Sequence, residues 1–200
     1  MSNDILTRVP GRRGHFRLES GYHTDLWFTL DALFVAPAAL APQVAALADQ
    51  LRLYQPTAVC GPLLGGAFLA HALAAHMGLR FYFSQPAPGA RGDGLFTAAY
   101  SLPSELRRRV AGERIALVDD VISAGSSVRA TLAELTTAGA TTVVVGSLAI
   151  LGQRAVEYFA AQELPLVTLT QQEFNLWLPA DCPLCQAHEP LADPVMSECL

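Results

Sequence analysis

The residues best suited to chemistry lie in residues 114–130, RIALVDDVISAGSSVRA. Four apolar residues lead into the pair Asp119 and Asp120, and small residues at 123–127 then precede a segment with helical spacing of apolar residues. This order predicts a buried strand, two carboxylates at its end, a loop and a helix. A helix N-terminus offers unpaired N–H donors, and small residues let an anion approach them. The run therefore predicts a phosphate site beside two acids, which suits a sugar phosphate.

Two other interpretations of this run exist. An acidic strand end can be a helix cap or a solvated pair of acids without any ligand. The acidic strand of a P-loop NTPase would require a glycine-rich loop that ends in Gly-Lys. The chain contains no lysine, which excludes the second interpretation.

The segment VDDVISAGSS resembles the phosphoribosyl diphosphate (PRPP) signature of type I phosphoribosyltransferases, and the chain is most similar to the orotate phosphoribosyltransferase family. The resemblance implies an α/β fold with a central, mostly parallel sheet flanked by helices and a small N-terminal β hood. It implies that Asp119 and Asp120 are catalytic and face the ribose. It also implies Mg²⁺ carried by PRPP and a homodimer. The 5′-phosphate would be bound by Ser123, Ala124, Gly125, Ser126 and Ser127.

A second glycine-rich loop follows an earlier apolar segment. Apolar spacing predicts a helix over residues 42–53, and residues 57–60 read as a strand that leads into GPLLGG and a helix over residues 66–77. The resemblance makes Leu63, Leu64, Gly65 and Gly66 the diphosphate-binding loop, whereas a glycine turn that only packs helix on sheet is the alternative. Strands that alternate with helices predict a parallel sheet, in which both loops lie at the carboxyl ends of strands.

The N-terminal 33 residues contain GHFRLESGYHT, in which apolar and polar residues alternate around Ser20 and Gly21. This alternation predicts a β-hairpin with a turn at these two residues. The segment is similar to the hood of orotate-type enzymes, which covers the base. Glu19, Ser20 and Gly21 are therefore expected at the base site.

Residues 84–96, SQPAPGARGDGLF, have the composition of a mobile loop. Their position corresponds to the catalytic loop of the family, and Arg91 is the one cation in the segment. The resemblance therefore makes Arg91 a catalytic candidate. A solvated linker is the alternative.

The tail carries the spacing Cys182-x-x-Cys185-x-x-His188, which could form part of a structural Zn²⁺ site. A closed site needs four ligands, and Cys199 or a carboxylate is left to complete it. A tail without metal is the alternative, since a similar CPLC ending occurs in some bacterial members of the family. We expect one domain over residues 1–200, with a hood at 1–33, a core at 34–170 and this tail at 171–200.

Composition limits the classes of partner. The net charge is −5 and all thirteen cationic side chains are arginine, with one short cluster at residues 107–109, so we expect no nucleic-acid partner. Residues 53–79 carry no charge, but Pro and Gly interrupt them, so we expect no membrane span. The first residues lack a secretory pattern and four cysteines suggest reduced thiols, from which we expect a cytoplasmic protein.

The expected reaction is transfer of the phosphoribosyl group of PRPP to a nitrogenous base with release of diphosphate. Orotate, and hence pyrimidine synthesis, is the first hypothesis, although Glu19 stands where the family has lysine and Arg91, Arg154 or Arg17 would have to supply the cation. The second hypothesis is the same chemistry on another, neutral base. The third is a PRPP-binding sensor or regulator with weak catalysis.

Overall fold

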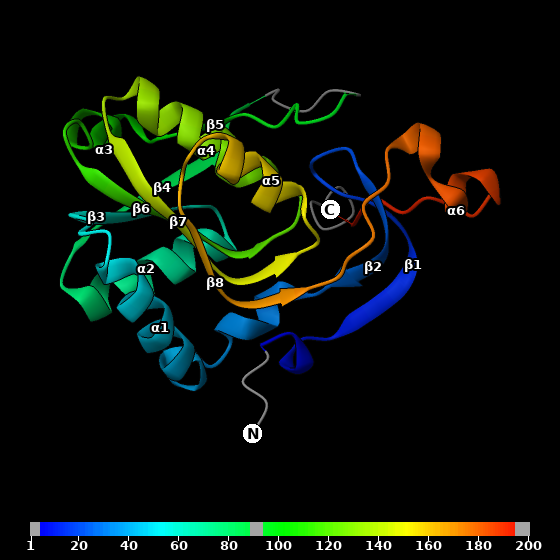
Figure 1. The fold of residues 1–200 in the computed structure, drawn as a ribbon, viewed down its shortest axis with the longest axis horizontal. Helices are drawn as coiled ribbons and strands as arrows, with labels where there is room; N and C mark the ends of the chain where they lie inside the picture. Colours follow the sequence, from blue (N-terminus) through cyan, green and yellow to red (C-terminus); the bar gives the residue numbers. More distant parts are fainter. Residues whose placement is uncertain (1–4, 89–93, 195–200) are drawn as a thin grey trace.

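A six-stranded sheet forms the centre of the molecule in the computed structural model, which describes residues 5–88 and 94–194 (Figure 1). Its order is β5-β4-β3-β6-β7-β8, and every neighbouring pair is parallel except β4 with β5. The α/β fold and the mostly parallel sheet predicted from the sequence are therefore confirmed. The strands are β3 (Ala58–Pro62), β4 (Arg80–Pro86), β5 (Tyr100–Ser101), β6 (Arg114–Ile122), β7 (Thr141–Leu151) and β8 (Leu166–Gln172).

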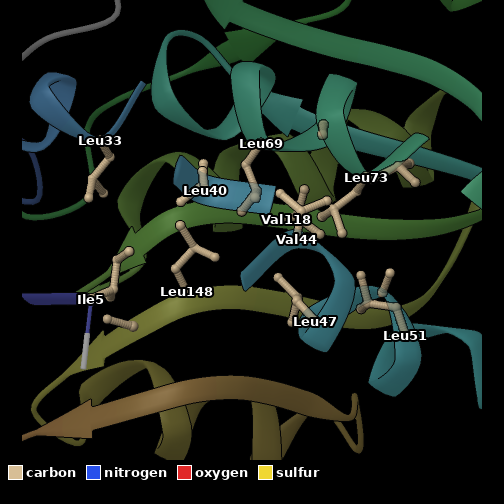
Figure 2. Close-up of a cluster of buried hydrophobic side chains, with 14 of the residues drawn as sticks. Ile5, Leu33, Leu40, Val44, Leu47, Leu51, Leu69, Leu73, Val118 and Leu148 are labelled. Atoms are coloured by element: carbon tan, nitrogen blue, oxygen red, sulfur yellow. The ribbon is translucent and has the colours of Figure 1, made fainter. Parts of the chain in front are cut away.

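Helices cover both faces of this sheet (Figure 1). Helices α1 (Pro37–Arg52) and α2 (Gly65–Met77) lie on one face, and α3 (Ser104–Arg109), α4 (Ser126–Thr137) and α5 (Arg154–Ala161) on the other. Two hydrophobic cores result. The first lies between the sheet and the helices α1 and α2 and is shown in Figure 2, and the second lies on the other face, against α4 and α5. Successive residues of β6 alternate between them, because Ala116 and Val118 pack in the first core while Ile115 and Leu117 pack in the second.

Several element boundaries differ from the sequence predictions by a few residues, among them the start of α1 and the end of β6. Helix α1 begins at Pro37 rather than Pro42, because Pro37 occupies its first position, where the missing N–H is not needed. Strand β6 continues for two residues past Asp120, because Val121 and Ile122 still pair with Ala149 and Ile150 of β7. The two acids therefore lie within the strand instead of at its last residue.

The predicted hood is present as the antiparallel hairpin of β1 (Gly11–Arg17) and β2 (His23–Phe28). Gly21 has φ +83°, in the left-handed region that favours glycine in a turn. The short helices η1 (Ile5–Arg8) and η2 (Leu30–Phe34) flank the hairpin. It stands at one end of the sheet, beside the tail with η3 (Pro179–Asp181) and α6 (Pro183–Gln186) (Figure 1).

Backbone hydrogen bonds join this tail to the hood. His23 and Trp177 exchange two N–H···O bonds of 2.9 Å, Arg17 N donates to Ala192 O at 2.9 Å, and Ala192 N donates to His15 O at 2.8 Å. Within the described part of the chain, no helix has the length and apolar character needed to cross a bilayer.

Candidate active site

A cavity of 310 Å³ opens at the carboxyl ends of the central strands and beneath the hood. Ligands of open parallel sheets bind at this edge, where the loops after adjacent strands meet. The walls come from the hood, the loop after β3, the end of β6, the loop before α4, the last residue of β7 and one residue after β8. The lining residues are Leu18, Glu19, Ser20, Leu26, Trp27, Phe28, Thr29, Leu30, Asp31, Leu64, Gly65, Asp120, Val121, Ile122, Ser123, Gly125, Ser126, Ser127, Leu151 and Phe174.

Asp119 and Asp120 are both buried, 7% exposed. Ser127 Oγ donates to Asp119 Oδ2 at 2.8 Å, and Val121 N donates to Asp120 Oδ1 at 2.9 Å. In the described part of the chain, neither carboxylate forms an ion pair with a cationic side chain. Burial raises the pKa of Asp119 well above its usual range, and the charge of Asp120 raises it further. Burial likewise raises the pKa of Asp120.

The glycines of the loop after β3 let this loop lie against the two acids. A Cβ atom on Gly65 would stand 2.2 Å from Asp120 Oδ2, and one on Gly66 would stand 2.6 Å from Asp119 Oδ1. A Cβ on Gly61 would meet the backbone oxygen of Gly66 at 2.1 Å. The predicted convergence of the two loops is therefore observed, and it depends on the absence of side chains at these positions.

The loop before α4 has the features of an anion site. Gly125 has φ +80° and precedes the first turn of α4, and Gly125, Ser126 and Ser127 all line the cavity. The first N–H groups of a helix have no partner within the helix and favour an anion. Ser126 Oγ is buried and has no hydrogen-bond partner among the described residues. A buried hydroxyl without a partner is costly, so this oxygen is placed to meet a group that the protein itself does not supply.

The hood closes the cavity from the opposite side. Glu19 accepts a hydrogen bond of 2.9 Å from Tyr100 Oη, and Ser20 is 2% exposed. Phe96 N donates to Ser20 O at 2.9 Å, and the Phe96 ring packs edge-on against Tyr22. The segment that follows residue 93 therefore contacts the turn of the hood.

The structure brings together most of the residues selected from the sequence. Glu19, Ser20, Leu64, Gly65, Asp120, Ser123, Gly125, Ser126 and Ser127 line the cavity. Asp119, Gly66, Leu63, Ala124 and Gly21 lie next to lining residues without lining it themselves. Arg91 lies outside the described residues. Arg17 and Arg154, the other candidate cations, do not line the cavity.

The cysteine tail forms a metal-ligand cluster, but the expected set was wrong in one residue. The ligand atoms of Cys182 and Cys185 and those of His15 and His23 in the hood all lie within 4.8 Å of one another. This cluster could hold a metal ion. His188 is not part of it, because its side chain is exposed after α6, where its backbone has φ +57°. Cys199 lies outside the described residues.

Neither hood histidine was predicted from the sequence as a candidate ligand. The hairpin register offered a signal, because Arg17 pairs with His23 and this places His15 and His23 diagonally across the two strands. The register gave no indication that the tail, more than 150 residues further along the chain, packs against these two histidines.

Comparison with known proteins assigns the fold to a family. Residues 34–179 match the model of the phosphoribosyl transferase domain. The orotate phosphoribosyltransferase of Thermotoga maritima is 30% identical over 198 residues, which cover 97% of each chain.

Two solved structures share the fold at lower identity. The orotate phosphoribosyltransferase of Aeropyrum pernix has a TM-score of 0.63 and 22% identity, over 86% of this chain and 93% of that one. The adenine phosphoribosyltransferase of Rhodothermus marinus has a TM-score of 0.62 and 19% identity, over 84% and 96%. Enzymes named for different bases match equally well, so the fold does not distinguish the base. The family-model match and the full-length relative together show that the chain belongs to the type I phosphoribosyltransferases.

Proposed function

We propose that the protein transfers the phosphoribosyl group of PRPP to orotate, releasing diphosphate and forming a nucleoside monophosphate for pyrimidine synthesis. The observation that carries the transferase chemistry is the buried pair Asp119 and Asp120, of which Asp120 lines the same cavity as Ser126, whose buried hydroxyl has no hydrogen-bond partner among the described residues. The choice of orotate is supported by the relative from Thermotoga maritima.

The 5′-phosphate would bind at the N-terminus of α4. The backbone amides of Ser123, Ala124, Gly125, Ser126 and Ser127 would donate to it, and Ser126 Oγ would gain the partner that it lacks. The diphosphate would bind at the loop of Leu63, Leu64, Gly65 and Gly66.

Asp119 and Asp120 would face the ribose. In the transfer, the bond from the anomeric carbon to diphosphate breaks with its electron pair, and a base nitrogen supplies the new bond and loses its proton. The anomeric carbon becomes positively charged in between, and buried carboxylates aimed at it stabilise this charge. Their burial makes the ionised forms costly until such positive charge is present.

The donor set also suits Mg²⁺, which members of the family generally use. Hard carboxylate oxygens are present in Asp119 and Asp120, and these acids have no protein cation beside them within the described residues. When bound with the diphosphate, Mg²⁺ would offset the charge of the leaving group. Arg91 remains a catalytic candidate, and a homodimer remains an expectation from the family.

Glu19, Ser20 and Gly21 would cover the base, with Trp27, Phe28 and Phe174 as apolar walls. One observation favours a second candidate, a neutral base. The charged residues that line the cavity within the described chain are Glu19, Asp31 and Asp120, all acidic. An orotate carboxylate without a cation would lose a charge-assisted bond of roughly 1.5–3 kcal/mol.

A base panel tests the proposal. The protein is mixed with PRPP, Mg²⁺ and orotate, uracil, adenine or hypoxanthine, and both diphosphate and nucleotide are measured. Orotidine 5′-phosphate as the preferred product supports orotate. Turnover with a neutral base alone would overturn orotate but keep the transferase, and PRPP binding without product from any base would leave the sensor hypothesis.

A variant sharpens the test of the base. Glu19→Gln removes the negative charge from the hood and keeps an acceptor for Tyr100. If orotate is the substrate, its KM should fall by about tenfold, because roughly 1.4 kcal/mol of repulsion corresponds to one decade. The KM for PRPP serves as the internal control. An unchanged KM for orotate would contradict a base site next to Glu19.

A further inference from the structure

The buried cluster of His15, His23, Cys182 and Cys185 lies between the hood and the tail, away from the residues that line the cavity. His15, His23 and Cys182 are each no more than 5% exposed, and Cys185 is partly buried. Both cysteines are free thiols. Two imidazoles and two thiols therefore converge from β1, β2 and the start of α6.

The separations of these atoms fit a tetrahedral metal ion. His15 Nε2 lies 3.0 Å from His23 Nδ1, 3.4 Å from Cys182 Sγ and 3.6 Å from Cys185 Sγ, and Cys185 Sγ lies 3.3 Å from His23 Nδ1. A tetrahedral Zn²⁺ with bonds of about 2.0–2.1 Å to nitrogen and about 2.3 Å to sulfur separates its ligand atoms by roughly 3.3–3.8 Å. The cluster is already close to this size.

Hydrogen bonding alone does not account for the convergence on His15. His15 Nδ1 lies 2.9 Å from the carbonyl oxygen of Glu189, which can only accept, so Nδ1 carries the proton. In the neutral ring Nε2 then has a single lone pair, yet three polar atoms lie within 3.6 Å of it. One central cation would accept an electron pair from each of the four ligand atoms, two imidazole nitrogens and two sulfurs. The bond to Glu189 is also the outer contact that fixes the ring of a metal-bound histidine.

We propose that these four residues bind one structural Zn²⁺ that fastens the C-terminal tail to the hood. Two thiolates and two imidazoles in a tetrahedron are typical of zinc, and four protein ligands leave no open position for a substrate. Backbone hydrogen bonds of Trp177 with His23 and of Ala192 with His15 and Arg17 join the tail to the hood before and after the two cysteines in the sequence. The ion would therefore hold the hairpin that covers the cavity.

Metal content provides the first test. Protein expressed with added zinc and dialysed without chelator is analysed by plasma mass spectrometry, for the wild type, Cys182→Ser/Cys185→Ser and His188→Asn. We expect about one zinc per chain in the wild type and in His188→Asn, and less than about a tenth in the double cysteine variant. His188→Asn is the matched control, since this exposed residue lies outside the cluster and asparagine tolerates its positive φ. A wild type without zinc, or with another metal in its place, would overturn the proposal, as would zinc retained in the cysteine variant.

X-ray absorption on the wild type keeps the test decisive if the cysteine variant does not fold. The proposal predicts a zinc shell of two sulfurs at about 2.3 Å and two nitrogens at about 2.0 Å. A shell of nitrogen and oxygen alone would overturn it. Chelation should increase amide hydrogen exchange in residues 11–28 and 177–192 while leaving α4 unchanged, and equal exchange with and without zinc would contradict the fastening role.

Discussion

The two ends of β6 carry buried acids in opposite situations. Glu113, just before the strand, is 6% exposed, and Asp119 and Asp120 near its other end are each 7% exposed. Glu113 pairs with Arg80 at 2.7 Å and accepts hydrogen bonds from Thr57 and Tyr82. The aspartates accept from Ser127 and nearby backbone N–H groups, without a cationic partner in the described chain.

The difference is the one we expect between a structural acid and binding acids. A buried carboxylate with a cation and several donors is compensated by the protein and holds its neighbours in place. A buried pair without a cation is costly to ionise, and perturbed groups of this kind gather at functional sites. We therefore expect β6 to contribute a stabilising ion pair at its amino end and a ligand site at its carboxyl end.

The largest expected effect follows from removing the charges of the binding pair. Asp119→Asn together with Asp120→Asn should lower kcat by about a thousandfold, because the developing positive charge loses its stabilisation. The free energy of unfolding at pH 7 should rise, since the variant no longer buries two costly carboxylates. Turnover assays and urea unfolding of the same preparation check both effects, and undiminished turnover would make these acids structural.

The structural acid should respond in the opposite way. Glu113→Gln removes the charge that Arg80 meets, and the free energy of unfolding should fall by about 1–3 kcal/mol. The kcat should stay within about twofold of the wild type, because Glu113 lies at the amino end of β6 and the cavity lies at the carboxyl end. A large loss of turnover in a folded Glu113→Gln protein would break the division between the two ends.

Two unpartnered hydroxyls offer a smaller, matched test. Ser126 Oγ and Thr142 Oγ1 are both buried without a hydrogen-bond partner, but Thr142 does not line the cavity. Ser126→Ala should weaken PRPP binding by roughly ten- to a hundredfold, the worth of one hydrogen bond to an anion. Thr142→Val should leave PRPP binding unchanged. Equal affinities in the two variants, measured by calorimetry, would remove Ser126 from the phosphate site.

The pH dependence of stability should show the smallest effect. Unfolded aspartates have a pKa of about 3.9, and the folded pair has a raised pKa, so the folded protein binds more protons between these values. The free energy of unfolding of the wild type should therefore fall, relative to Asp119→Asn/Asp120→Asn, as the pH rises from 4 through the folded pKa values. Urea unfolding of both proteins at several pH values measures this difference. A difference in the free energy of unfolding between variant and wild type that does not change with pH would contradict the prediction.

The local part of this account could be predicted from the sequence. The strand, the acid pair and the loop of residues 123–127 are contiguous, so their order alone placed them. The glycines at 65 and 66 could be assigned to a loop, and parallel topology brought that loop to the same edge.

The features missed in the sequence depend on contacts between distant segments. Glu113 meets Thr57 and Arg80 across neighbouring strands, which no periodicity encodes. The cysteines of the tail were selected as candidate metal ligands, but the histidines that cluster with them lie more than 150 residues away in the hood, and His188 was the nearer yet wrong choice. The base site depends on how Glu19 meets Tyr100, another contact between distant segments.

Calorimetric titration of PRPP with Mg²⁺ into two variants compares the two ends of β6 in one measurement. We predict that Glu113→Gln binds PRPP as the wild type does, while Asp119→Asn/Asp120→Asn binds at least about tenfold more weakly, a difference of roughly 1.4 kcal/mol. Equal PRPP affinity in both variants, with both folded, would contradict the assignment of the carboxyl end of β6 as the binding end.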